Sequence, residues 1–128
     1  MEESKATPTE QGTILSADLT IIQAEEVREF YKQVIGWEHI EINMGDYSDY
    51  LMTTKDGVPV AGVCHQRGVN SGLPPVWMVY FQVNDLKQSL ETCKKLGGKV
   101  LREPGSSTCG SFGVIEYPAG AICALSQM

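Results

Sequence analysis

Three side chains could carry out chemistry in this sequence: His65, Asp18 and Tyr80. The imidazole of His65, at the end of an apolar segment, could act as an acid, a base or a ligand donor. Asp18 could anchor a polar group or accept a proton, and Tyr80 joins an apolar ring to a hydroxyl that needs a partner when buried. Each also has a plainer interpretation: an idle imidazole at a strand end, a carboxylate bonded to a loop, and a hydroxyl at a sheet edge.

Several other chemistries lack their motifs. The sequence has no G-x-S-x-G, no Walker loop and no G-x-G-x-x-G. Its cysteines form no C-x-x-C pair, which argues against a zinc ribbon or a thioredoxin-type site. We expect all four to be reduced, three as small core residues and one as an exposed loop thiol; they are Cys64, Cys93, Cys123 and, in the loop, Cys109.

Composition bounds the class of protein. The 128 residues suffice for one compact domain with a core, and 42% of them are hydrophobic. The formal net charge of −6 argues against a nucleic-acid or anionic-membrane partner, since both favour a basic face. No apolar run approaches the roughly 20 residues that span a bilayer. The acidic N-terminus lacks a hydrophobic segment, so we expect a cytoplasmic protein without a secretory signal.

The helices and strands that must position these side chains follow one pattern that occurs twice in the sequence. In the second copy, Val76–Val83 alternates as a strand, Asn84 or Asp85 can cap a helix, and Gly97 or Gly98 ends it. In the first copy, Thr13–Ile22 is the strand and Ala24–Ile35 the helix, with an apolar stripe of Val27, Phe30, Tyr31, Val34 and Ile35. Three strands follow each helix: Trp37–Asn43, Tyr47–Thr54 and Val58–His65, then Lys99–Arg102, Ser111–Tyr117 and Ala121–Gln127.

The two copies align closely. Gly36 and Gly98 lie 62 positions apart, and Gly57 and Gly120 lie 63 apart, a slippage of one residue. A repeat of this length indicates two copies of one supersecondary unit. We therefore predict an α+β fold with a flexible tail (1–12), a first βαβββ module (13–66), a linker (67–74) and a second βαβββ module (75–128), packed as one compact domain.

The order and spacing of several short motifs resemble the vicinal oxygen chelate superfamily, which includes glyoxalase I, bleomycin-resistance proteins and extradiol dioxygenases. The resemblance covers roughly residues 13–127 and implies two modules that form curved, mixed-sheet half-barrels enclosing a cavity. The motifs are Phe30-Tyr31 with Ile35-Gly36-Trp37, Asp56-Gly57 with Val60-Ala61-Gly62, Trp77-x-x-Tyr80, Val83-Asn84-Asp85, Leu96-Gly97-Gly98-Lys99-Val100, and Tyr117-Pro118-Ala119-Gly120-Ala121.

Metal-dependent members of that superfamily carry His, Glu or Gln ligands on the first and last strand of each module. Counted onto this chain, those positions fall at Ser16 and Ala61, and at Met78 and Ala124. None is a good ligand for Zn, Ni or Fe, and a register error of one residue adds only Cys123 as a donor. We therefore expect no metal site and no cofactor.

The cavity implied by the resemblance could remain without the metal. Residues two and four along from each position share its face of the strand, and together they mix apolar walls with a few polar groups. No catalytic residue is assigned. The ligand-binding candidates are His65, Tyr80, Asp18, Gln82, Ser16, Met78, Ala61 and Ala124.

Three functions remain open. The first is a metal-free protein of the bleomycin-resistance kind that binds a small, partly aromatic or amphipathic compound. The second is a lyase, isomerase or dioxygenase-like enzyme acting on a small carbonyl or aromatic substrate, either through proton transfer by His65 with Asp18 or Tyr80, or through a metal. The third is an interaction module with a collapsed cavity. Because superfamily members commonly pair, the resemblance also implies a homodimer.

Overall fold

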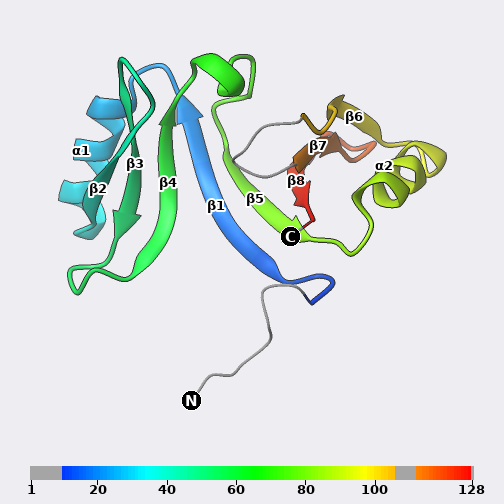
Figure 1. Cartoon of the computed structure of the whole chain (residues 1–128), viewed down its shortest axis with the longest axis horizontal. Helices are drawn as coiled ribbons and strands as arrows, with labels where there is room; N and C mark the ends of the chain where they lie inside the picture. Colours follow the sequence, from blue (N-terminus) through cyan, green and yellow to red (C-terminus); the bar gives the residue numbers. More distant parts are fainter. Residues whose placement is uncertain (1–9, 106–111, 128) are drawn as a thin grey trace. The chain divides into compact units, whose positions relative to one another are not determined.

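The computed structural model describes residues 10–105 and 112–127. They form two compact units, the first of residues 16–77 and the second of residues 10–15 with the described part of 78–127. Each unit has one α-helix and four strands of sheet (Figure 1). Most of the predicted tail, through residue 9, and the predicted loop thiol Cys109 lie outside the described residues.

The first unit has the predicted order of strand, helix and three strands. Its strands lie in the order β2-β3-β4-β1, with β1 parallel to β4 and the other neighbours antiparallel. A short 3-10 helix occupies part of the segment predicted as a linker. The elements are β1 (Ile14–Ile21), α1 (Ala24–Ile35), β2 (Glu38–Asn43), β3 (Ser48–Thr53), β4 (Pro59–His65) and η1 (Gly68–Asn70).

Helix α1 packs on its sheet through residues spaced three and four apart. Ala24 is fully buried, and Val27 packs with it against Val63 of β4 and its neighbours on β3. Trp77 packs against the same cluster, and its indole N–H donates to the Tyr31 hydroxyl of α1 at 3.1 Å. The predicted stripe was wrong at three positions, because the buried stripe lies on the Ala24 side of the helix. Phe30, Val34 and Ile35 are exposed.

The second unit repeats the arrangement with its strands in the order β5-β8-β7-β6. Here β5 runs parallel to β8, and the remaining pairs are antiparallel. Its core joins the helix to one face of the sheet through Val83, Leu86, Leu90 and Leu125. The elements are β5 (Trp77–Gln82), α2 (Leu86–Lys95), β6 (Lys99–Arg102), β7 (Phe112–Glu116) and β8 (Ile122–Ser126).

The ends of α2 follow from its sequence. Of the two predicted capping residues, Asp85 is the one used: its carboxylate accepts a hydrogen bond from the backbone N–H of Gln88 at 3.1 Å. Beyond the last turn, Gly97 adopts a φ of 93°, which a residue with a side chain rarely tolerates. Both signals were visible in the sequence.

The described strands of each unit contain one irregularity that the sequence did not reveal. On β4, Met52 pairs with Ala61 but Thr53 pairs with Pro59, so Val60 is an extra residue. On β6, Val100 pairs with Ile115 and Arg102 with Val114, so Leu101 is extra. A β-bulge of this kind reverses the facing of every residue on one side of it relative to the other. Both bulges change the candidate site.

Neither α1 nor α2 has the length and apolar character required to cross a membrane, and the search covered only the described residues.

Candidate functional site

The strand pairing corrects one of the four positions derived from the repeat. Asp18 pairs with Gly62 in the first unit, and Tyr80 pairs with Ala124 in the second. Both pairs keep the 62-residue offset of the repeat, so Gly62, and not Ala61, corresponds to Ala124. Gly57 and Gly120 do lie 63 positions apart, one more than the offset of the repeat. The extra residue Val60 in the first unit restores the offset of 62 by the time the chain reaches Gly62.

This correction separates candidates that were expected to share one face in the first unit. Val63 lies in the core with Ala24 of α1, and alternation places Ala61 and His65 on the same side. Asp18 points the other way: a Cβ on Gly62 would lie 2.5 Å from its Oδ1. Ser16, two residues before Asp18, shares its side. The structure therefore does not bring His65 and Asp18 together on one face.

His65 contacts carboxylates at both ring nitrogens. Its Nδ1 lies 3.4 Å from Oδ1 of Asp49, and its Nε2 lies 3.5 Å from Oε1 of Glu25 on α1. The same Asp49 oxygen accepts the backbone N–H of His65 at 2.8 Å. Only 7% of His65 and 5% of Asp49 is exposed. Each ring nitrogen already faces a carboxylate, so neither is available to a substrate. This geometry suits a structural role in which His65 links β3, β4 and α1.

The neighbouring Cys64 is equally unsuited to nucleophilic chemistry. Burial raises the pKa of its thiol well above the usual range, and the carboxylates of Asp18 and Asp49 raise it further. Burial also raises the pKa of Cys123, with a smaller contribution from Cys93. A thiol that stays protonated is a poor nucleophile and a poor metal ligand. The described cysteines are free thiols.

In the second unit, the predicted candidates do lie on one face. Phe81, Cys123 and Leu125 pack toward α2, so their neighbours in the alternation point to the opposite side of the sheet. That side carries Met78, Tyr80, Gln82 and Ala124, as predicted. Met78, Gln82 and Ala124 are almost fully buried, and the Gln82 amide donates to the carbonyl of Val83 at 3.0 Å.

Two residues that the sequence did not single out complete this face. Phe112 of β7 meets Tyr80 edge to face, with ring centroids 5.3 Å apart. The bulge at Leu101 turns Arg102 to the same side, where its guanidinium carbon lies 4.4 Å above the centre of the Phe112 ring. We call this set the Arg102 face; it consists of Met78, Tyr80, Gln82, Arg102, Phe112 and Ala124. It combines a cation, two aromatic rings and an apolar wall.

The donor atoms do not fit the divalent ion of the metal-dependent relatives. At the four strand positions the first unit offers Ser16 and Gly62, and the second offers Met78 and Ala124. No group of three or more His, Cys, Asp or Glu side chains in residues 10–105 and 112–127 is arranged to hold a metal ion. A divalent transition metal normally needs at least three such ligands.

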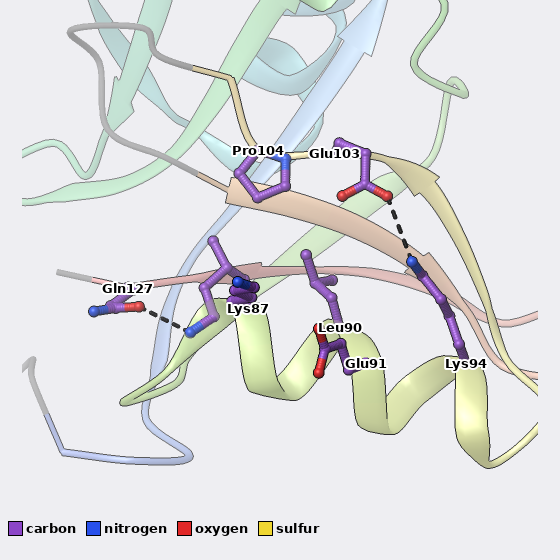
Figure 2. A pocket seen from close by; sticks show the side chains of 8 residues that line it. Lys87, Leu90, Glu91, Lys94, Glu103, Pro104 and Gln127 are labelled. Atoms are coloured by element: carbon purple, nitrogen blue, oxygen red, sulfur yellow. Dashed lines mark hydrogen bonds and ion pairs between the residues drawn. The ribbon is translucent and has the colours of Figure 1, made fainter.

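Two surface hollows lie away from the predicted candidates. The larger, about 560 Å³, lies beside α2, and Figure 2 shows Lys94 extending from the helix toward Glu103, 3.9 Å away. Its lining is Leu86, Lys87, Leu90, Glu91, Lys94, Glu103, Pro104 and Gln127. The second, about 380 Å³, lies in the first unit around the turn after β2 and includes Asp46 and Tyr47. No predicted ligand-binding residue lines either hollow.

Sequence comparison finds relatives for most of the chain. The model of the Glyoxalase/Bleomycin resistance protein/Dioxygenase superfamily matches residues 13–121. The proteins named "Putative glyoxylase CFP32" from Mycobacterium bovis and Mycobacterium tuberculosis are 30% identical over 114 residues, which is 88% of this chain and 43% of theirs. The chain thus spans less than half the length of these curated relatives.

Solved structures show the same fold at low sequence identity. A Legionella pneumophila protein described as NAD-dependent benzaldehyde dehydrogenase matches with a TM-score of 0.58 and 16% identity, over 88% of this chain and 96% of that one. Methylmalonyl-CoA epimerase from Mycobacterium tuberculosis matches with a TM-score of 0.53 and 12% identity, over 91% and 89% of the two chains. At these identities the likeness concerns the fold alone.

Proposed function

Because the chain belongs to the Glyoxalase/Bleomycin resistance protein/Dioxygenase superfamily, we propose that it binds a small, partly aromatic or amphipathic compound without a metal ion. The superfamily includes binding proteins as well as enzymes, so membership alone selects no reaction. The choice between binding and catalysis depends on which side chains occupy the faces of the strands in each unit.

The Arg102 face is the observation that carries this proposal. It places the Tyr80–Phe112 ring pair, which is partly exposed, next to a guanidinium on a face where the Met78 and Ala124 side chains are buried. Apolar and aromatic surface with a few fixed polar groups is the usual make-up of a small-molecule site. The ring edges and faces favour a partly aromatic ligand, since such contacts add to the free energy of burial.

Catalysis by His65 has less support. The imidazole contacts carboxylates at both nitrogens, and Asp18, one of its two predicted partners, lies on the opposite face of the sheet. A general acid or base needs a nitrogen within reach of the substrate. The metal-dependent alternative requires a donor set that the four strand positions do not supply. Binding is therefore the function that the geometry supports best.

The proposal is tested by titrating EDTA-dialysed protein with a library of small aromatic and amphipathic compounds, using thermal shift and then calorimetry. A ligand at 100 times its Kd should stabilise the fold by about 2.7 kcal/mol. Phe112→Leu should weaken binding severalfold. Tyr117→Leu, which changes an aromatic residue of the same unit that is 66% exposed, should not.

Two results would contradict the proposal. One is that no compound in the library stabilises the protein. The other is that binding is absent after EDTA treatment and returns when Zn²⁺, Ni²⁺ or Fe²⁺ is added, because the site would then require the metal.

A further inference from the structure

Arg102 is one of three arginines in the described residues that lie over an aromatic ring. The guanidinium carbon of Arg28 lies 4.7 Å from the centre of the Tyr50 ring, and that of Arg67 lies 4.1 Å from the centre of the Tyr47 ring. Arg102 lies 4.4 Å from the centre of Phe112. The same cation–π geometry therefore recurs in three separate places.

The other two stacked arginines also hold a carboxylate. Arg28 pairs with Glu29 at 3.1 Å, and Arg67 pairs with Asp46 at 3.2 Å. No carboxylate among the described residues pairs with Arg102, and its Nη1 is buried without any hydrogen-bond partner there. A guanidinium always carries its charge and has five N–H donors to satisfy. A buried donor without an acceptor raises the free energy of the folded chain. A ligand that supplies an acceptor would remove this penalty.

We propose that Arg102 binds the carboxylate of a small aryl or arylalkyl carboxylic acid whose ring packs against Phe112 and Tyr80. This inference rests on the proposed function and adds the charge and class of the ligand. The planar fork of a guanidinium matches the two oxygens of a carboxylate, and one guanidinium balances one negative charge. The Phe112 ring holds the cation in place, and its contact with Tyr80 extends the apolar surface next to the charge.

The acid and its neutral counterpart distinguish this inference from the broader proposal. We would measure the binding of phenylacetate and of 2-phenylethanol to the wild-type chain by calorimetry at neutral pH. The two probes share a ring and a chain length, and only phenylacetate carries a carboxylate. We expect phenylacetate to bind at least about tenfold more tightly, the usual contribution of a charge-assisted hydrogen bond.

Variants locate the charge. Arg102→Gln should weaken phenylacetate binding about tenfold or more and leave binding of 2-phenylethanol nearly unchanged, while Arg102→Lys should recover only part of the loss. The matched control is Arg67→Gln, which changes an arginine that also lies over a ring but is already paired with a carboxylate; it should leave both affinities unchanged. The wild-type comparison of acid and alcohol keeps the test valid if a variant at position 102 does not fold.

Several outcomes would overturn the inference. Equal affinity for phenylacetate and 2-phenylethanol would show that the site does not recognise a carboxylate, and would leave the proposed binding function intact. If Lys87→Gln or Lys94→Gln abolishes phenylacetate binding and Arg102→Gln does not, the anion binds at the hollow beside α2 and not at Arg102. Absence of binding by both probes overturns this inference, and absence of binding by the whole library removes the proposed function as well.

Discussion

His65, a leading candidate in the sequence, has little freedom to react because both ring nitrogens face carboxylates. His65 was a candidate because an imidazole is versatile, but residue type says nothing about its partners. Asp49, the carboxylate that contacts it from β3, gave no signal in the sequence because a single acidic residue in a half-polar strand is common. Residue type therefore predicted which groups could act, and only the register of β3 against β4 showed what they contact.

Arg102 and Phe112 show the opposite case. Neither was a candidate, because simple alternation places Arg102 on the same side as Val100, which packs against α2. The extra residue Leu101 between them reverses that assignment. The shared face of the four candidates on β5 and β8 was predicted correctly for the complementary reason, since the described part of those two strands pairs without an irregularity.

Cys64 makes the stability of the fold depend on pH. Its thiol has a higher pKa in the folded state, first because of burial and then because of Asp18 and Asp49. Above about pH 8.5 the thiol of the unfolded chain ionises while the folded one stays protonated, so the unfolded state binds fewer protons. The free energy of unfolding should therefore fall as the pH rises above this value, by at most about 1.4 kcal/mol per pH unit for this group.

Urea denaturation at several pH values from 7.5 to 10 would measure this slope. Cys64→Ala should make the decline shallower, although Cys123 contributes in the same direction and part of the slope should remain. Gln33→Ala, an exposed substitution in α1 that removes no titratable group, serves as the control and should keep the wild-type slope. An unchanged slope in Cys64→Ala would show that the thiol does not ionise differently in the two states.

At the scale of elements, the repeat predicted the order of helices and strands, and the structure confirms it. Ala24–Ile35 and Lys99–Arg102 match to the residue. Periodicity succeeded because each element has a core on one face, and glycines such as Gly97 mark where helices end. Bulges are not visible in this way, since one extra residue leaves the local alternation on either side intact. The error at Ala61 follows from the bulge at Val60 alone.

The two helices differ in how they begin. Asp85 caps α2 through its carboxylate, whereas Gln23, which precedes α1, makes no side-chain capping bond. Asp85→Ala should lower the free energy of unfolding by about 1 kcal/mol, because the N–H of Gln88 loses its acceptor. Urea denaturation at pH 7 measures the effect. Asp85→Ser, which keeps an oxygen acceptor, should retain most of the stability, and a loss as large as that of Asp85→Ala would exclude capping as the cause.

At the scale of the whole molecule, we predict a homodimer. Helix α1 leaves Phe30 and Val34, one turn apart, 57% and 58% exposed, and apolar surface of this kind often marks an interface. Sedimentation equilibrium should show twice the chain mass for the wild type. Phe30→Glu should shift the equilibrium to monomers, while Lys32→Glu, on the opposite side of α1, should not. A wild-type monomer at all concentrations would refute the prediction.

The bulge at Leu101 also bears on how this scaffold could acquire new specificities. Insertion or deletion of a single residue near position 101 exchanges which of the following side chains lies on the Arg102 face and which lies toward α2, without any change of amino-acid type. Leu101 is 48% exposed, so a change of one residue at this bulge in β6 disturbs little packing. Proteins with this architecture could therefore diversify what they recognise through small gaps in alignment, a kind of variation that comparison of matched positions alone overlooks.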